Sequence, residues 1–376
     1  DTLTQRRYRR FARGGAGLIW FEATAIVQEG RANPRQLYLN KKTLDSFRTQ
    51  VEEIKEEGMR QNGFAPVVIC QLTHSGRYAK PEGVPAPLIA YNNPLFEKEQ
   101  PIDKSRIVSD DKLKRLEEAF GATALLAQEA GFDGADIKCC HRYLLSEMLS
   151  AFTRPGDYGG AFENRTRLLR NAIFAAKGAT SGEFLITSRV NLYDGFAYPY
   201  GFGVSPTGGL MPDLTEPKAL VTLLHEELRL PMLDFTIGNP YVNPHVNRPY
   251  DGGPYVPDEH PLEGVARMLG CIGQLKKAFP SLCVIGSGFS YLRQFSPYLA
   301  AGAVEQSVCD LAGFGRMAFA YPDFPRDTLY GEGFNARKTC IACGKCSALM
   351  RAGTVAGCVV RDGETYLPFY QAHCCV

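Results

Sequence analysis

The densest group of chemically capable side chains comes directly after a short apolar stretch that ends at Ile137. Lys138, His141, Arg142 and Tyr143 fall within six consecutive positions. A lysine or a histidine can donate a hydrogen bond to a carbonyl, and a phenol, with an ordinary pKa of about 10, keeps its proton at neutral pH and can donate it. These four residues are therefore candidates for catalysis. We expect the cations Lys138 and Arg142 to lower the pKa of Tyr143.

Two glycine-containing turns follow later apolar stretches. Their sequences are Gly-Ser-Gly at 286–288 and Gly-Phe-Gly-Arg at 313–316. Backbone N–H groups in such turns can approach a phosphate closely, and an arginine adds positive charge. With Gln71 and Arg189 after two other apolar stretches, the turns suit a phosphorylated cofactor such as FMN. The candidates for holding its phosphate are Ser287, Gly288, Gly315 and Arg316.

Four of the twelve cysteines crowd one short stretch near the C-terminal end. Cys340, Cys343, Cys346 and Cys358 follow the pattern C-x₂-C-x₂-C-x₁₁-C. Four thiolates in one such group can bind a [4Fe–4S] cluster. Zinc held by four cysteines is the alternative, but its sites more often use two separated Cys-x-x-Cys pairs, so the spacing favours the cluster. Clustered cysteines in a chain of this size indicate metal binding and a reducing compartment rather than a disulfide framework.

Short apolar stretches alternate with amphipathic segments along the chain. A helix is expected at the start of the chain, and the segment 42–60 has apolar side chains at spacings of three and four, which indicates another. This alternation is typical of a parallel sheet with helical connections. The expected strands lie in 16–27, 66–77, 131–143, 183–191, 230–239, 282–290 and 308–316.

The fold class predicted from this pattern is α/β, and specifically a (β/α)₈ TIM barrel. A closed barrel has eight strands, and because the chain opens with a helix, we expect the first strand upstream of Asp1. A doubly wound open sheet is the alternative, but no strand is followed by the Gly-x-Gly-x-x-Gly fingerprint. We expect two parts, a barrel over 1–330 and a small cysteine-rich iron–sulfur segment over 331–376.

Composition excludes several classes of function. The 376 residues include 42 basic and 40 acidic side chains, so the net charge is +2, and the mean hydropathy is −0.18. Near-balanced charge without a basic tract argues against nucleic-acid binding and polybasic membrane binding. No apolar run approaches the roughly 18 residues of a membrane span, and no signal peptide is visible. We expect a cytoplasmic protein.

Several stretches together carry a resemblance to a known family. They include GLIWFEATAIVQEGR, ICQLTHSGR, GFDGADIKCCHRYLLSEMLSAFTRPGDYGGAFENRTR, ITSRV, IGSG and GFGR, in this order. The sequence resembles the old yellow enzyme family of FMN-dependent ene-reductases. It most resembles the branch typified by 2,4-dienoyl-CoA reductase, which couples the barrel to an iron–sulfur cluster. The resemblance runs from about residue 14 to about residue 362.

The resemblance implies roles for individual residues around the flavin. Ala23 would touch the ring system, Gln71 would bind its pyrimidine edge, and Arg189 would lie near N1 and the C2 carbonyl. A fixed cation there offsets negative charge that accumulates on the ring. The four glycine-turn residues named above would hold the phosphate.

The resemblance also bears on the catalytic group. Tyr143 matches the family's proton-donating tyrosine, while Lys138 and His141 stand where relatives bind the substrate carbonyl. Lys138 departs from the commonest residue there, a histidine, and Arg142 replaces a frequent glycine. His245 lies near the position where dienoyl-CoA reductases have a second acid. The alternative is that it is a loop histidine in a solvated turn without a catalytic role.

The activity implied is reduction of a C=C bond conjugated to a carbonyl, with hydride from N5 of FMN and a proton from Tyr143. Relatives with such clusters continue into a half that binds FAD, for which this chain leaves no room, so FAD is not expected. Electrons would come from NAD(P)H, from an electron-donor protein or from a missing C-terminal portion. The substrate would be a small unsaturated carbonyl compound, either a bulky apolar enone such as a 3-oxo steroid, bile acid or bilin, or an enoyl thioester. A homo-oligomer is a further expectation.

Two other functions remain open at this point. Lys138 could act as the Schiff-base nucleophile of a barrel aldolase or isomerase, because one barrel fold hosts many chemistries. Alternatively, the cysteines could make the chain a non-catalytic iron–sulfur electron-transfer protein. The tyrosine-rich loops at 191–209 and 239–255 either line a substrate mouth or pack onto the barrel rim.

Overall fold

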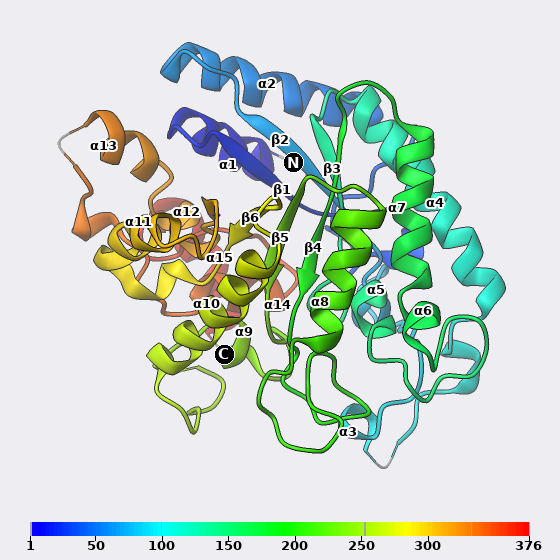
Figure 1. Ribbon diagram of the computed structural model, residues 1–376. Coiled ribbons are helices and arrows are strands. Elements are labelled where there is room, and N and C mark those ends of the chain that lie inside the picture. Colours follow the sequence, from blue (N-terminus) through cyan, green and yellow to red (C-terminus); the bar gives the residue numbers. More distant parts are fainter. Residues whose placement is uncertain (1, 99, 252, 332, 376) are drawn as a thin grey trace.

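The centre of the molecule is a curled parallel sheet. The computed structural model (Figure 1) describes residues 2–98, 100–251, 253–331 and 333–375. Seven strands follow one another in chain order, and every neighbouring pair is parallel. The strands are β1 (Leu18–Ala25), β2 (Val67–Thr73), β3 (Gly134–Ile137), β4 (Leu185–Asn191), β5 (Met232–Thr236), β6 (Cys283–Gly286) and β7 (Leu311–Ala312).

Helices connect consecutive strands and cover the outside of the sheet (Figure 1). The longer ones are α1 (Thr2–Arg13), α2 (Leu44–Asn62), α4 (Asp110–Glu129), α7 (Arg167–Ala179), α10 (Pro261–Ala278), α11 (Ser296–Glu305) and α15 (Gly363–Cys374). The shorter ones are α3 (Pro94–Glu97), α5 (Leu144–Met148), α6 (Phe162–Arg165), α8 (Thr215–Val221), α9 (Pro244–Asn247), α12 (Arg316–Ala320), α13 (Phe324–Tyr330) and α14 (Lys345–Arg351). In the described part of the chain, no helix combines the length and the apolar composition that crossing a membrane requires.

Local sequence explains where the helices begin and which face they bury. The hydroxyl of Ser109 accepts a hydrogen bond of 3.2 Å from the backbone N–H of Lys112, and Asp110 and Asp111 add negative charge at the same end of α4. Both features stabilise a helix N-terminus. Leu113, Leu116 and Phe120 lie on one face of α4 and are buried. The apolar stripe of α4 is therefore the surface that faces the sheet and the neighbouring helix.

The sequence located all seven strands, but it made some of them too long. The stretch 131–143 contains a strand of only four residues, β3, followed by an isolated bridge between Cys139 and Val190. His141 and Arg142 then adopt left-handed backbone conformations with φ of 64° and 54°, so the extended chain does not continue to Tyr143. A closed eight-stranded barrel is not what the described residues form: the sheet has seven strands, with β1 and β7 at its edges. The strand order is nevertheless that of a (β/α) barrel.

The C-terminal segment packs against the barrel through small apolar clusters of its own. One contains Met317, Tyr321 and Cys340, and the other contains Leu349, Val355, Val359 and Tyr366. The carboxylate of Asp362 also binds two arginines of α1, Arg6 at 2.7 Å and Arg10. The N-terminal helix and residues 340–374 thus hold each other in place. The separation into domains 1–330 and 331–376 stays a prediction.

Candidate functional site

A buried carboxylate organises the polar ends of four neighbouring strands. Asp136 of β3 accepts hydrogen bonds from the indole of Trp20 (2.7 Å), the side-chain amide of Gln71 (2.6 Å) and the backbone N–H of Arg189 (2.6 Å). Burial raises the pKa of Asp136, and the three donors oppose that rise. Gln71 and Arg189, which the sequence assigned to the flavin, are thereby fixed beside each other.

Arg189 carries a charge that this network keeps in place. Its Nε lies 3.0 Å from Oδ2 of Asp234 on β5. Burial is the largest single influence on the pKa of Arg189 and lowers it, but Asp234 and the other nearby acidic groups together outweigh burial, so the pKa is raised. Burial in turn raises the pKa of Asp234 to about 7, although Arg189 opposes the rise. A permanent cation therefore stands at the ends of β3 to β5.

Lys138 and Tyr143 are in direct contact beyond the end of β3. Both are buried, and Nζ of Lys138 lies 3.8 Å from the centre of the Tyr143 ring. Burial lowers the pKa of Lys138 to about 8. The hydroxyl of Tyr143 is 2.7 Å from the hydroxyl of Tyr241, so the two can share a proton.

The expectation that cations lower the pKa of Tyr143 is wrong. Burial raises this pKa well above its ordinary value, and the neighbouring Tyr241 raises it further. Lys138 lies over the ring face rather than beside the hydroxyl, and the guanidinium of Arg142 is bound by Asp194. Tyr143 therefore keeps its proton, as a donor must, but gains no acidity from its neighbours.

Two tyrosines that the sequence reasoning did not single out complete this region. The ring of Tyr241 stacks on that of Tyr78 with a centroid distance of 3.8 Å and an angle of 20°. The hydroxyl of Tyr78 accepts a hydrogen bond of 2.8 Å from the side-chain amide of Asn239. We call Tyr78, Tyr143 and Tyr241 the tyrosine cluster. Tyr241 is 43% exposed, so the cluster opens to solvent on that side.

His141 lies beside the cluster in its neutral form. Nε2 accepts a hydrogen bond of 3.3 Å from the side-chain amide of Asn247. Burial lowers the pKa of His141 well below its usual value, and the charges of Arg189 and Lys138 lower it further. Because Nε2 is the acceptor, the ring proton stands on Nδ1.

Arg142 points away from the hydroxyl of Tyr143 and holds two loops. Its side chain is fully buried and lies 2.8 Å from both the Asp194 carboxylate and the Tyr200 carbonyl oxygen. It also donates a 3.1 Å hydrogen bond to the Tyr91 hydroxyl. These contacts make Arg142 an anchor of the loop after β4, and a direct catalytic role stays a prediction.

His245 lies in the loop after β5, in α9. Its Nδ1 is 2.5 Å from the Tyr255 hydroxyl, and its Nε2 is 3.8 Å from Glu259. Within the described residues, these are its polar partners, and they do not belong to the tyrosine cluster. Its proposed role as a second acid stays a prediction.

The two glycine turns lie against each other, and their role in holding a phosphate stays a prediction. A Cβ on Gly313 would lie 3.0 Å from the Gly286 carbonyl oxygen, and Gly288 adopts a φ of 102°. The Ser287 hydroxyl donates to the Phe235 carbonyl at 2.8 Å. Added side chains would fill the space between the turns or strain the backbone.

Three further flavin candidates are placed around this region. Ala23 lies at an irregularity in the pairing of β1 with β2, and its carbonyl accepts a 2.9 Å hydrogen bond from Gln36. A Cβ on Gly315 would meet no atom within 4 Å, so the turn is open there. The side chain of Arg316 lines the space next to the four cysteines instead of the glycine turns.

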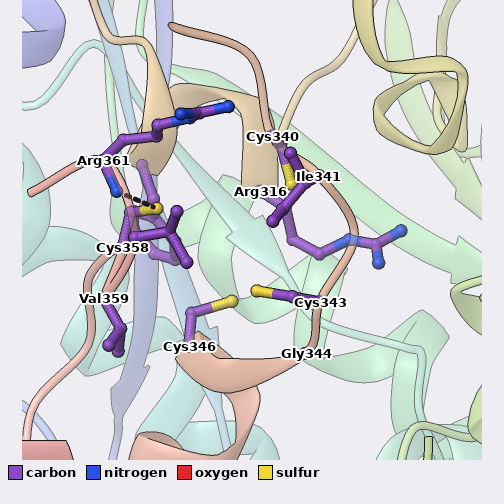
Figure 2. Close-up of a pocket in the computed structure, with 11 residues that line it drawn as sticks. Arg316, Cys340, Ile341, Cys343, Gly344, Cys346, Cys358, Val359 and Arg361 are labelled. Atoms are coloured by element: carbon purple, nitrogen blue, oxygen red, sulfur yellow. Dashed lines mark hydrogen bonds between the residues drawn. The ribbon is translucent and has the colours of Figure 1, made fainter. Parts of the chain in front are cut away.

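The four predicted metal ligands come together around one pocket. Cys340, Cys343, Cys346 and Cys358 line it together with Arg316 and Arg361, and Figure 2 shows the sulfurs of Cys343 and Cys346 directed toward each other. We call it the cysteine pocket.

Backbone amides already serve two of these sulfurs. The N–H of Ala342 donates to Sγ of Cys340 (3.4 Å), and the N–H of Arg361 donates to Sγ of Cys358 (3.3 Å, dashed in Figure 2). In the described ranges, no three His, Cys, Asp or Glu side chains converge closely enough to hold a metal ion.

Sequence comparison assigns the family. The profile of the NADH:flavin oxidoreductase / NADH oxidase family matches residues 2–202. The chain belongs to this family. The match includes β1 to β4, and with them Ala23, Gln71, Lys138, Tyr143 and Arg189. The old yellow enzyme-like resemblance seen in the sequence is confirmed at this level.

Curated relatives within the family are named NADPH dehydrogenase. That of Clostridium acetobutylicum is 33% identical over 196 residues, which span 51% of this chain and 54% of the relative. That of Bacillus subtilis is 33% identical over 178 residues, or 46% of this chain and 48% of the relative. The matched region thus spans about half the length of these family members.

Solved structures share the fold at low sequence identity. A 2-naphthoyl-CoA reductase complex superposes with a TM-score of 0.74 at 19% identity, over 95% of this chain and 51% of that one. The old yellow enzyme homologue of Zymomonas mobilis superposes with a TM-score of 0.64 at 21% identity, over 88% of this chain and 84% of that one. A coverage of 95% is too high to leave out the whole segment after residue 330, so part of that segment belongs to the shared fold.

Proposed function

We propose that this family member is a flavin-dependent oxidoreductase that reduces a C=C bond conjugated to a carbonyl. The observation that carries the proposal is the contact between Lys138 and a buried, protonated Tyr143, next to a strand-end network that holds Gln71 and Arg189. One turn thus supplies carbonyl-binding donors and a proton donor, the groups that such a reduction requires.

The residues at the strand ends fit FMN. Ala23, Gln71 and Arg189 would contact its ring system, and Ser287, Gly288 and Gly315 would hold the phosphate, with Arg316 in the same turn. Their fit rests on the fixed cation of Arg189 and on the close approach of the two glycine turns. When bound, FMN supplies hydride transfer between NAD(P)H and the substrate.

The chain's own residues would bind and protonate the substrate. Lys138 and Nδ1–H of His141 would donate hydrogen bonds to the carbonyl oxygen, where negative charge develops as the β-carbon is reduced. Tyr143 would donate its proton to the α-carbon. Tyr241, at 2.7 Å, would return a proton to Tyr143 from the solvent-facing side.

Exposed apolar side chains favour a bulky apolar substrate. Leu210 and Met211 in the loop after β4 are 56% and 78% exposed, and Val256 in the loop after β5 is 81% exposed. The side-chain amide of Asn243 donates to the Asp194 carbonyl at 2.9 Å and joins these loops. A 3-oxo steroid, bile acid, bilin or enoyl thioester has the required size and unsaturation, and the structurally similar 2-naphthoyl-CoA reductase is named for a bulky thioester.

The cysteine pocket is proposed to hold a [4Fe–4S] cluster, as in the 2,4-dienoyl-CoA reductase branch. Support comes from the four thiols around one pocket, their two N–H donors and the adjacent arginines. The electrons would come from NAD(P)H or from an electron-donor protein.

The test is anaerobic reconstitution with FMN and iron, followed by substrate assays. The purified chain should bind about one FMN, and NADPH consumption should depend on an added enone from a panel containing a 3-oxo-4-ene steroid, an enoyl thioester and a cinnamate. Failure to retain FMN, or NADPH oxidation that produces no saturated carbonyl compound, would overturn the proposal.

A second candidate rests on Lys138 alone, since a buried lysine with a pKa of about 8 suits a Schiff-base nucleophile. Borohydride trapping of an aldehyde or ketone on Lys138 in flavin-free protein would favour the aldolase. Its absence, together with flavin-dependent reduction, would favour the reductase.

A further inference from the structure

Arg248 joins two regions that are far apart in the sequence. It follows α9 in the loop that carries Tyr241, and its Nη1 donates a 2.6 Å hydrogen bond to the Ser347 hydroxyl in α14. Its Nη2 donates to the Pro240 carbonyl oxygen at 3.3 Å. One guanidinium therefore bridges the cysteine-rich segment and the loop of the tyrosine cluster.

On the side of the cysteines, Arg248 acts through the residue next to Cys346. The Ser347 hydroxyl accepts this hydrogen bond from Arg248, and Ser347 directly follows Cys346 in α14. Arg316 lines the cysteine pocket together with Cys346, so a second arginine lies on this side of Arg248. The bridge thus ends at a proposed cluster ligand.

Arg248 is part of a concentration of positive charge. Arg316 and Arg351 are cations close enough to repel its charge. No ion pair between a carboxylate and any of these three arginines occurs in the part of the chain that the structure describes. Burying several arginines close together costs free energy unless an anion lies nearby. Thiolates in the cysteine pocket are the anions that this arrangement accommodates.

On the other side, Arg248 supports the proton donor. The Pro240 carbonyl that it binds precedes Tyr241, whose hydroxyl contacts that of Tyr143 at 2.7 Å. Stacking on Tyr78 fixes the Tyr241 ring from its other face. A shift of the Pro240–Tyr241 backbone would therefore move the partner of Tyr143.

We propose that Arg248 is a positioning residue that couples the cysteine pocket to the tyrosine cluster. Its charge, which the Ser347 hydroxyl holds next to Cys346, offsets the negative charge of the thiolates that would bind the cluster. Its second terminal nitrogen holds the Pro240 carbonyl, and with it Tyr241, against Tyr143. The first half of the proposal rests on the proposed function, because it needs the [4Fe–4S] cluster. The guanidinium does both tasks at once because its two terminal nitrogens point to different elements.

The test compares the reconstituted holoprotein with two substitutions of one residue. Arg248→Gln removes the charge, and Arg248→Lys keeps the charge but loses the forked geometry. Arg293→Gln is the matched control, because Arg293 pairs with Asp251 on the surface. The readouts are the midpoint potential of the cluster by spectroelectrochemical titration, and the rate at which an enone reoxidises the flavin.

A nearby cation favours the form with the extra electron, so Arg248→Gln should lower the cluster potential, while Arg248→Lys and Arg293→Gln should leave it near that of wild type. Both Arg248 variants should slow enone-dependent reoxidation, by up to about 10²-fold, because a misplaced catalytic group costs that order of rate. Ser347→Ala should lower the potential without a comparable loss of rate.

Arg248→Gln with full iron content but an unchanged cluster potential would overturn the electrostatic role. Wild-type reoxidation rates in both Arg248 variants would overturn the positioning role. Wild-type protein that binds FMN and reduces enones without acquiring iron would refute both the cluster and the coupling, yet leave the reductase standing.

Discussion

Two regions of the molecule gather several reactive side chains, but they do so by different means. One is the cysteine pocket, and the other is the group of polar residues at the ends of β2 to β4, which we call the barrel mouth. At the mouth, Asp136, Arg189 and Lys138 are held by adjacent strands of one continuous core, and Asp136 is satisfied by three donors within the chain. At the pocket, three of the thiols stand on loops and that of Cys346 lies in the short helix α14, and the apolar clusters nearby are small. The mouth is organised by the fold alone, whereas the pocket concentrates cations and thiols that a metal cluster would complete. Four experiments test this contrast.

The largest effect is expected for the iron content of the cysteine pocket. Cys343→Ser should lose most of the iron of a cluster that contains about four per chain, because it removes one of four ligands. FMN content should not change, since the mouth does not depend on the pocket for its folding. Iron and flavin analysis of anaerobically prepared protein measures both. Cys375→Ser, an exposed thiol outside the pocket, is the control, and equal iron in both variants would contradict the ligand assignment.

Within the mouth, the proton donor should dominate the rate. Tyr143→Phe should slow enone reduction by about 10²–10⁴-fold, the usual worth of a positioned proton donor, and should leave flavin binding and reduction by NADPH intact. Stopped-flow absorbance separates these half-reactions. Tyr198→Phe, at an exposed tyrosine of a neighbouring loop, should behave like wild type. If flavin reduction rather than reoxidation slowed in Tyr143→Phe, the residue would be organising the cofactor instead.

Arg142 tests whether a buried residue beside the donor acts in the chemistry or in the fold. Arg142→Met leaves Asp194 buried without its partner, and breaking such a pair costs about 3–5 kcal/mol of unfolding free energy. Arg293→Gln, which breaks a surface pair, should cost about 1 kcal/mol or less. Urea denaturation of both measures the difference. A stable Arg142→Met protein with abolished turnover would instead make Arg142 catalytic.

The smallest effect is a pH dependence that only the mouth should have. The folded chain holds the proton of Asp234 up to about pH 7, while the unfolded chain releases it near the ordinary value of 3.8. Between these values the folded state binds more protons, so the contribution of Asp234 to stability falls as pH rises. Asp234→Asn should therefore gain on wild type from pH 5 to pH 7.5 in denaturation experiments. The exposed Asp45→Asn should give no such difference, and a parallel pH profile for wild type and Asp234→Asn would refute the argument.

Sequence reasoning found what is encoded locally. Alternating apolar and polar stretches located the seven strands, and the spacing of four cysteines located a pocket that all four do line. It extended β3 too far, because nothing in the residue types marks the end of the strand at Ile137 or the left-handed backbone of His141 and Arg142. Backbone strain at these two candidate catalytic residues is visible only in the structure.

Sequence reasoning did not find contacts between residues that are far apart along the chain. Tyr241 lies 98 positions from Tyr143, and Asn239 lies 161 positions from Tyr78, so no local period connects them. The tyrosine-rich loop was the one available signal, but it did not distinguish Tyr241 from its neighbours. Nothing in the sequence singled out Arg248, because its proposed role depends on its contact with Ser347, which lies on a distant helix.

The chain contains a single tryptophan, and the fold places it where it is most informative. Trp20 donates its indole N–H to Asp136, the carboxylate that also holds Gln71 and the backbone of Arg189. Its emission therefore comes from one known location and responds to one hydrogen-bond network. The protein thus carries its own optical reporter, which can follow the entry of a cofactor or the melting of the strand ends without any label.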